Sequence, residues 1–272
     1  MENKVAQLKE IASRVRKNIV SMIAESGSGH PGGSLSAVEI LVTLYFNEMN
    51  VNIEAPKDEN RDRFVLSKGH AAPALYSVLA EKGFFDKSEL NKLRKTGAML
   101  QGHPNMTYTK GVDMSTGSLG QGISAAVGMA LAGKIDKKAY KVFALLGDGE
   151  LEEGQVWEAA MAAAHYKLNN LIAFVDNNGL QIDGKCEDVM NPAPISNKFE
   201  AFNWNVICAD GHDFTALMDA IKEAYKVTDK PTVIVCKTVK GKGVSFMENE
   251  AGWHGTAPNK EQCEKAIEEL SI

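Results

Sequence analysis

Polar side chains follow two apolar segments of this chain at the points where each segment ends. The first segment, residues 142–146, runs into Gly147-Asp148-Gly149-Glu150, and the second, residues 171–175, runs into Asp176-Asn177-Asn178. The Ala-rich stretch between them predicts a helix, so we expect a β-α-β unit. In open α/β sheets, ligands bind in the crevice at the carboxyl ends of the strands.

The residue types at these two strand ends suit a cation and a phosphate. Asp148 offers a carboxylate and Asn178 an amide oxygen, both of which bind hard divalent cations. A cation that also holds two phosphates needs few protein ligands, because phosphate and water oxygens complete its coordination shell. Gly149 lets the backbone approach a phosphate without an intervening side chain.

Four of the six histidines stand beside glycine in loops or at element ends: His30, His70, His103 and His254. Residues 67–71 (Ser-Lys-Gly-His-Ala) follow an expected strand and open an expected helix, whose free amide groups attract anions. Taken singly, each motif also fits an ordinary turn or a solvated side chain, and so does the lysine-rich segment 240–243. His165 and His212 receive no role, since His212 fits a turn and helix cap.

Taken together and in order, these motifs resemble transketolase over nearly the whole chain. Gly147–Gly149 and Asn177-Asn178, with 27 residues between them, resemble the thiamine diphosphate fingerprint. The other motifs are Gly-His-Pro at 29–31, Ser-Lys-Gly-His-Ala-Ala-Pro at 67–73, Gly-His-Pro at 102–104, Thr-Gly-Ser-Leu-Gly-Gln-Gly at 116–122 and Trp-His-Gly at 253–255.

The resemblance implies a role for each matching position. Mg²⁺ (or Ca²⁺ or Mn²⁺) would be held by Asp148, Asn178 and the carbonyl of Leu180. Thiamine diphosphate would be contacted by His70, Gly117, Ser118, Leu119, Asp148, Gly149, Glu150, Asn178, Lys240 and His254. The catalytic residues would be His30, His70, His103 and His254, because proton transfers on sugar hydroxyls need groups that titrate near neutrality. Of these, His30 and His103 match residues that hydrogen-bond the donor ketose, and Glu153 resembles an acidic residue that communicates with a second active site.

The chain departs from the family pattern mainly in length. Asn105 stands where many members carry glutamate, and Ser118 replaces a common proline, but neither change removes a ligand. A usual transketolase continues into a pyrimidine-binding domain that supplies a catalytic glutamate and most sugar-phosphate contacts. We therefore expect the N-terminal subunit of a split transketolase, active only with a C-terminal partner subunit in an α2β2 heterotetramer. It would transfer a two-carbon ketol (glycolaldehyde) unit from a ketose phosphate to an aldose phosphate.

Three alternatives are considered. A 1-deoxyxylulose-5-phosphate synthase or the first component of a 2-oxoacid dehydrogenase shares the cofactor fingerprint, but segments 68–70 and 253–255 follow the transketolase pattern. A catalytically silent cofactor-binding subunit would have no use for His30 and His103. A nucleotide-binding α/β protein is disfavoured because the sequence has no G-x-x-x-x-G-K-[ST] loop.

The elements that must position these residues alternate between strand and helix. Apolar periodicity predicts helices over 4–25, 34–46, 71–82, 123–134, 214–225 and 261–270. Strands are expected over 64–66, 142–146, 171–175, 206–209 and 232–237. This alternation predicts an α/β fold, a mainly parallel sheet with helices on both faces, in a single domain over residues 1–272. The resemblance implies that this domain has the thiamine diphosphate-binding (diphosphate-domain) fold.

Composition excludes several other classes of protein. The net charge of −5 favours neither nucleic acid nor an anionic membrane as a partner. The sequence contains no run of about 18 apolar residues, so we expect no transmembrane helix. The four cysteines are scattered without a C-x-x-C pair, which argues against a disulfide framework or zinc site and fits a reducing cytoplasm.

Overall fold

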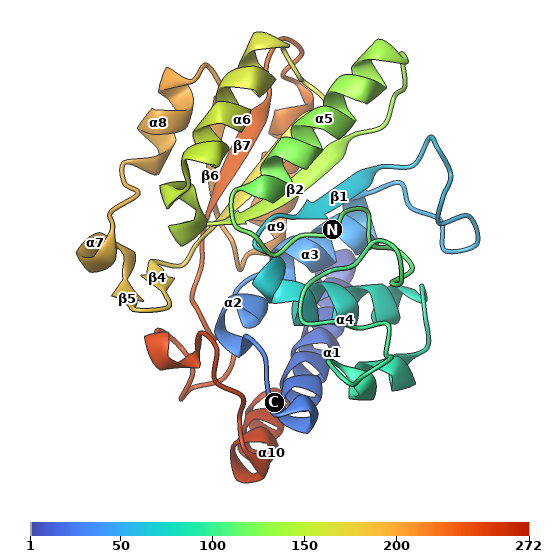
Figure 1. The fold of residues 1–272 in the computed structure, drawn as a ribbon, viewed down its shortest axis with the longest axis vertical. Helices are drawn as coiled ribbons and strands as arrows, with labels where there is room; N and C mark the ends of the chain where they lie inside the picture. Colours follow the sequence, from blue (N-terminus) through green and yellow to red (C-terminus); the bar gives the residue numbers. More distant parts are fainter. Residues whose placement is uncertain (1, 272) are drawn as a thin grey trace.

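A five-stranded parallel sheet forms the centre of the computed structural model, which describes residues 2–271. All five expected strands are present, and every neighbouring pair runs parallel. In spatial order they are β1 (Arg63–Leu66), β2 (Val142–Gly147), β3 (Leu171–Asn177), β7 (Thr232–Lys237) and β6 (Asn205–Asp210). Helices cover both faces of this sheet (Figure 1), so the predicted α/β class is confirmed.

The two faces of the sheet are covered by different helices. One face carries α5 (Gln121–Ile135), α6 (Gly154–His165) and α8 (Ile195–Ala201). The other carries α1 (Glu2–Ser26), α3 (Val38–Thr43), α4 (Ala72–Lys82) and α9 (Phe214–Tyr225), with α10 (Lys260–Glu269) packed on α1.

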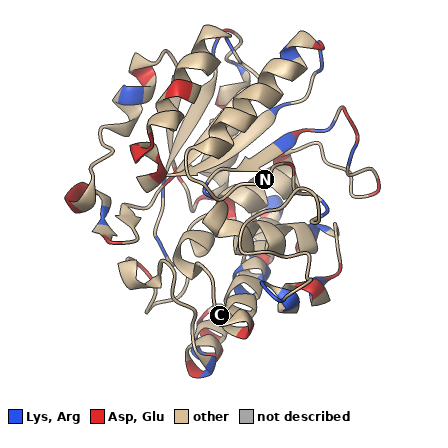
Figure 2. Ribbon diagram, in the orientation of Figure 1, with Lys and Arg blue, Asp and Glu red and all other residues tan. Residues whose placement is uncertain are grey.

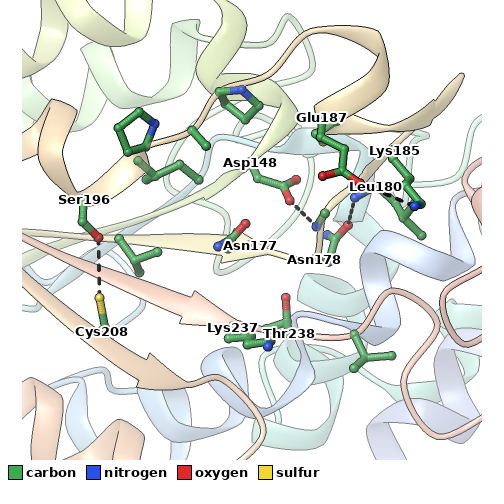
Figure 3. A pocket seen from close by; sticks show the side chains of 18 of the residues that line it. Asp148, Asn177, Asn178, Leu180, Lys185, Glu187, Ser196, Cys208, Lys237 and Thr238 are labelled. Atoms are coloured by element: carbon green, nitrogen blue, oxygen red, sulfur yellow. Dashed lines mark hydrogen bonds and ion pairs between the residues drawn. The ribbon is translucent and has the colours of Figure 1, made fainter.

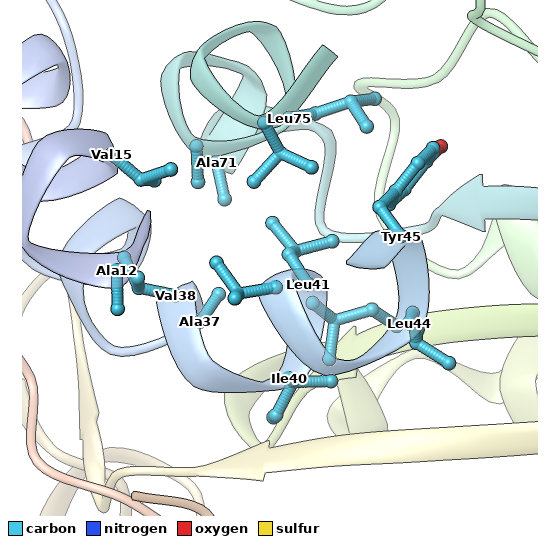
Figure 4. Close-up of a cluster of buried hydrophobic side chains, with 14 of the residues drawn as sticks. Ala12, Val15, Ala37, Val38, Ile40, Leu41, Leu44, Tyr45, Ala71 and Leu75 are labelled. Carbon is cyan, nitrogen blue, oxygen red and sulfur yellow. The ribbon is translucent and has the colours of Figure 1, made fainter. Parts of the chain in front are cut away.

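Alternate side chains of each strand enter the two cores. Phe143 and Leu145 of β2 pack into the core beneath α1, α3 and α4, whereas Val142 and Ala144 enter the core beneath α5 and α6. This alternation follows from the two-residue period of a strand. Because both faces are covered, β2 and β3 are almost continuously apolar, which is why the sequence predicts them well. Figure 4 shows part of the first core, where side chains of α1, α3 and α4 interlock.

One predicted helix was wrong in extent. Residues 34–46 form α2 (Pro31–Leu35), α3 and a π-helix over Leu44–Glu48, not one continuous helix. The Ser36 hydroxyl contacts the carbonyl of Gly33 at 3.3 Å and donates to the carboxylate of Asp176 at 2.6 Å. Side-chain bonding of this kind competes with the helical ladder, so the chain breaks between α2 and α3.

Several short elements follow β3 without a strong signal in the sequence. They are the hairpin β4 (Leu180–Gln181) and β5 (Gly184–Lys185), then α7 (Cys186–Val189) and α8. Short 3₁₀ segments occupy Gly69–Ala71, Lys87–Lys92, Gly149–Glu152 and Ala251–Trp253. The β4–β5 hairpin and the 3₁₀ turn after β2 lie at the carboxyl edge of the sheet, where the predicted ligands are found.

Charged residues lie mostly on the outer helices and loops, while the strands are largely free of them (Figure 2). Several charged residues are nevertheless buried, and burial of a charge is costly unless a partner compensates it. Lys68, Asp148, Glu150, Asp176 and Lys240 are all buried, and all lie at or just beyond the carboxyl ends of strands. Between residues 2 and 271, no helix has the length and apolar character to span a membrane.

Candidate active site

The carboxyl ends of β1, β2, β3 and β7 meet at a cavity of about 370 Å³. Of the ten residues predicted to contact the cofactor, all except Ser118 line this cavity. Ser118 is exposed and lies outside the lining. The lining consists of Lys68, His70, Gly117, Leu119, Gly147, Asp148, Gly149, Glu150, Glu152, Glu153, Asn178, Leu180, Gln181, Ile182, Lys240 and His254.

Three of the four predicted catalytic histidines form one cluster. The ring centroids of His30 and His70 are 5.4 Å apart, those of His30 and His254 5.5 Å, and those of His70 and His254 5.2 Å. They come from segments far apart in the chain: the start of α2, the 3₁₀ turn after β1, and the 3₁₀ turn before α10. The fold therefore brings three histidines that are distant in the sequence into one cluster.

These three rings are held neutral. Burial, followed by the charge of nearby Lys240, lowers the pKa of His254 to about 3. Burial and then Arg94 lower the pKa of His30 to about 4, and burial lowers the pKa of His70 well below its usual value. A neutral imidazole has one donor and one acceptor nitrogen, so each ring can both give and receive a hydrogen bond near pH 7.

His103 lies apart from this cluster. It is exposed, and its ring lies against Gly117, where an added Cβ would come 2.9 Å from the ring Cγ. Its carbonyl oxygen accepts a hydrogen bond from the Tyr76 hydroxyl at 2.9 Å. Burial and Arg94 lower the pKa of the ring. The structure thus places His103 on the outer side of the Gly117 segment, whereas Gly117 itself lines the cavity.

Lys240 is a buried cation that faces the cavity. It is 1% exposed, and its ammonium donates to the Leu180 carbonyl at 3.1 Å and to His254 Nδ1 at 2.9 Å. It forms no ion pair with a carboxylate of the described chain. Burial, then the charge of Lys68, lowers the pKa of Lys240 to about 8. The lysine-rich segment 240–243 is thus not simply solvated surface, and Lys240 is suited to face an anion.

Lys68 and Asp176 form a second buried feature that sequence reasoning missed. The Lys68 ammonium pairs with the Asp176 carboxylate and donates to the Gly33 carbonyl at 3.0 Å. The same carboxylate accepts hydrogen bonds from the hydroxyls of Ser36 and Thr238. Burial acts to raise the pKa of Asp176, but the charge of Lys68 and these hydrogen bonds hold it below its usual value. The sequence did hold one signal for this pair, because Asp176 places a carboxylate at the end of an otherwise apolar strand.

The three predicted metal ligands, Asp148, Asn178 and Leu180, line the cavity, and Figure 3 shows them near one another, seen from the larger cavity beside it. Asp148 is 2% exposed, and its carboxylate accepts hydrogen bonds from the amides of Gly149, at 2.9 Å, and Gly179. The Asn178 amide oxygen accepts from the Leu180 N–H at 3.1 Å. Burial, then the charge of Asp176, raises the pKa of Asp148 to about 6.

Within residues 2–271, no cluster of three His, Cys, Asp or Glu side chains could hold a metal. The predicted set differs in kind, because it consists of one carboxylate, one amide oxygen and one backbone carbonyl. Oxygen ligands of this sort suit a hard cation. The Leu180 carbonyl keeps a second lone pair beside its bond to Lys240. This ligand set remains a prediction.

Glu150 turns its carboxylate into the protein. It accepts hydrogen bonds from the Ser67 hydroxyl at 2.5 Å, the Gly120 amide at 2.9 Å and the Gly147 amide at 3.1 Å. These bonds join the ends of β1 and β2 to the start of α5. Burial raises the pKa of this carboxyl. The predicted contact of Glu150 with the cofactor remains untested, and the bonds present show it as a support of the cavity wall.

A larger cavity of about 1190 Å³ lies beside the first (Figure 3). It is lined by residues of the α7–α8 segment and of the carboxyl ends of β6 and β7. It shares Asp148, Asn178 and Leu180 with the smaller cavity. It contains none of the three clustered histidines, and neither Lys68 nor Lys240 lines it. We therefore place the candidate active site in the smaller cavity.

Comparisons with known proteins identify the family of the chain. Residues 7–271 match the family model of the transketolase thiamine diphosphate binding domain. The chain is 44% identical over 270 residues to the 6-deoxy-6-sulfo-D-fructose transketolase subunit SqwG of Clostridium sp. (strain MSTE9), covering 99% of this chain and 98% of that protein. It is 43% identical to an apulose-4-phosphate transketolase subunit of Phocaeicola vulgatus, covering 94% of this chain and 91% of that protein.

A solved structure shows the same fold in a longer chain. Transketolase from Pichia stipitis, in complex with sedoheptulose-7-phosphate, superposes with a TM-score of 0.92 at 34% identity. The match covers 97% of this chain but only 41% of the Pichia chain. The sequence resemblance is thus confirmed, and this chain belongs to the transketolase family, whose thiamine diphosphate-binding domain it comprises.

Proposed function

We propose that this chain is the N-terminal, cofactor-binding subunit of a transketolase-type enzyme. With a partner subunit, it transfers a two-carbon ketol unit from a ketose phosphate to an aldose phosphate. The observation that carries the proposal is one cavity lined by His70, His254 and the buried Lys240 together with the oxygen ligands Asp148, Asn178 and Leu180, with His30 packed against the two histidines. Family membership supports the same reaction class.

The residues of the cavity fit thiamine diphosphate and a divalent cation. A volume of about 370 Å³ is that of a small-molecule site. His30 does not line this cavity, but its ring packs against those of His70 and His254, and its buried Nδ1 has no hydrogen-bond partner among the described residues. Asp148 lies beside a second buried carboxylate, so a divalent cation there would relieve the repulsion that raises its pKa. When bound, the cofactor supplies the carbon nucleophile for cleaving the bond next to a carbonyl.

The chain's own groups divide the remaining work. Asp148, Asn178 and the Leu180 carbonyl hold the cation, for which we propose Mg²⁺, while Lys240 offsets the negative charge of the diphosphate. His70 and His254 donate N–H groups to phosphate oxygens. His30 and His103 hold the sugar hydroxyls and accept or return their protons. A bound anion would offset the charges of Lys240 and Lys68, which lower the pKa of His254 in addition to the larger effect of burial.

The names of two relatives support a separate partner. Both are called transketolase subunits, and this chain spans nearly their whole length. We propose that residues 1–272 form a single domain and pair with a C-terminal subunit that carries the pyrimidine-binding domain, in an α2β2 assembly. Those relatives act on different anionic sugars according to their names, so we propose an anionic ketose as donor without naming one.

A reconstitution assay tests the proposal. The purified chain, with thiamine diphosphate, Mg²⁺, xylulose 5-phosphate and an aldose phosphate, should show negligible turnover. Adding the product of a neighbouring gene that encodes a pyrimidine-binding domain should restore turnover, and an Asp148→Ala chain should not support it. Robust turnover by the chain alone would refute the need for a partner. Turnover with pyruvate but not with the ketose phosphate would indicate a different thiamine diphosphate enzyme.

A further inference from the structure

Contacts among the side chains of Arg16, Glu39 and His212 connect α1, α3 and the turn between β6 and α9. The Arg16 guanidinium forms a bidentate ion pair with the Glu39 carboxylate, with two N···O distances of 2.7 Å. The Oε2 atom of this carboxylate, which Arg16 also contacts, lies 2.9 Å from His212 Nδ1. Arg16 and Glu39 are both buried, although neither lines the cavity of the active site.

The contacts of His212 define its tautomer. The backbone N–H of Val239 donates to His212 Nε2 at 2.8 Å, so Nε2 carries no proton. In a neutral ring the proton then resides on Nδ1, which donates it to Glu39. Burial acts to raise the pKa of Glu39, but Arg16 and the bond from His212 lower it to about 2. The carboxylate is therefore charged, and it orients the imidazole.

His212 and Arg16 both bond the backbone of the segment that carries Lys240. Val239 directly precedes Lys240, and Arg16 Nε donates to the Lys242 carbonyl at 3.0 Å on the other side. The Lys240 carbonyl accepts from the Asn249 N–H at 3.0 Å. Lys240 is thus held from both directions, with its ammonium against the Leu180 carbonyl and His254.

We propose that His212 is a positioning residue for the active site: through the Val239 amide it holds the backbone of Lys240 so that the ammonium faces the cavity. The inference rests on the proposed function, because it assigns Lys240 to an anionic cofactor. His212 does not line the cavity of the active site, although it lines the larger cavity beside it, so we infer that it acts on Lys240 through the segment 239–242. The Arg16–Glu39 pair behind it fixes the ring.

Two amide substitutions separate the two bonds of the ring. His212→Gln places an amide oxygen near the Nε2 position, so it keeps an acceptor for Val239. His212→Asn places an amide near the Nδ1 position, so it keeps a donor for Glu39 and leaves the Val239 N–H without a partner. Hydrogen exchange of the Val239 amide in the full chain should be slow in the wild type and in His212→Gln, and at least about tenfold faster in His212→Asn. Equal exchange in all three proteins would overturn the proposed bond.

Binding of thiamine diphosphate with Mg²⁺, measured by calorimetry, then tests the consequence. His212→Asn should bind about fivefold more weakly than the wild type, as expected for one lost hydrogen bond, and His212→Gln should bind nearly as well as the wild type. In a Lys240→Met background, His212→Asn should cause little further loss, because the group that it positions is absent. An equal loss in both backgrounds would show a general structural role and overturn the proposal.

A further variant and a control complete the design. If His212→Asn does not fold, His212→Leu replaces it, since this change removes the acceptor for the Val239 N–H and keeps a side chain of similar bulk. It should weaken binding in the wild-type background and not in Lys240→Met, and any other pattern contradicts the proposal. A wild-type chain that binds no cofactor in the complex with its partner subunit would refute the proposed function, whereas hydrogen exchange would still decide whether the His212 bond exists.

Discussion

The backbone N–H of Asp148 donates a hydrogen bond to the carbonyl oxygen of Asp176 at 3.2 Å, where β2 and β3 end side by side. The two buried carboxylates have opposite environments. Asp176 is paired with the ammonium of Lys68, whereas Asp148 accepts hydrogen bonds from backbone amides and has no cationic partner in the described chain. The fold thus provides a charge partner for one aspartate, and we propose that a metal ion provides it for the other.

This arrangement predicts that Asp148 costs stability when no metal is bound. The pKa of Asp148 is raised to about 6 in the folded chain from 3.8, so the stability it contributes is present below pH 3.8 and is lost as the pH rises through 6. Asp148→Asn removes this charge. Without metal and cofactor at pH 8, we expect the variant to be more stable by on the order of 1–3 kcal/mol.

Urea unfolding at pH 8 and at pH 5 checks this expectation. The advantage of Asp148→Asn should shrink at pH 5, where much of the wild-type carboxyl is already protonated. A variant that is less stable than the wild type at pH 8 would show that the hydrogen bonds from Gly149 and Gly179 outweigh the cost of burying the charge.

The histidine cluster predicts a loss of stability in acid. The folded-state pKa of His254 is about 3 and that of His30 about 4, against 6.5 for the free side chain. The unfolded chain therefore binds more protons between pH 6.5 and 4, so the free energy of unfolding falls as the pH drops through this range. His254→Gln should reduce this dependence.

The difference between wild type and variant isolates the contribution of His254 from that of the carboxyl groups. Urea unfolding from pH 7.5 to 4.5 provides the measurement. His165→Gln is the matched control, since His165 is exposed at the end of α6 and its removal should leave the slope unchanged. Parallel curves for the wild type and His254→Gln would contradict the assignment of a buried neutral ring.

His103 is predicted to act on substrate and not on cofactor. Because its exposed ring lies outside the Gly117 segment, His103→Ala should leave cofactor affinity near that of the wild type. It should lower kcat/KM for the donor at least about threefold to tenfold, the effect of losing one hydrogen bond to an uncharged group. Donor kinetics and cofactor titration, both in the complex with the partner subunit, separate the two effects. Weak cofactor binding with normal donor kinetics at saturation would place His103 in the cofactor site instead.

Local sequence signals were sufficient for most of the fold. The strands at 142–146 and 171–175 were placed within two residues because buried parallel strands are apolar throughout. The helix over 214–225 was placed at its observed bounds, and Asp213 caps it by accepting bonds from the amides of Thr215 and Ala216. The order of glycine and histidine motifs identified the family, which the family match confirms.

The remaining features depend on contacts between distant segments. The helical stretch is interrupted at Ser36, whose hydroxyl contacts the Gly33 carbonyl and also reaches Asp176, 140 residues away. Lys240 stands in a glycine- and lysine-rich segment that is typical of solvated loops, yet His254 and Leu180 enclose it. His212 does form the expected turn, with its N–H bonded to the Asp210 carboxylate, but its ring reaches Glu39 on α3. Single-sequence patterns carry no signal for such partners.

Calorimetric titration of the chain in complex with its partner subunit, with thiamine diphosphate in the presence and absence of Mg²⁺, tests the central claim most directly. That claim is that the cavity at the carboxyl ends of β1, β2, β3 and β7 binds the cofactor through a metal held by Asp148 and Asn178. We expect binding that requires Mg²⁺, and an affinity at least about tenfold lower in Asp148→Ala, a change of about 1.4 kcal/mol. Metal-independent binding, or an unchanged affinity in a folded Asp148→Ala variant, would contradict the claim.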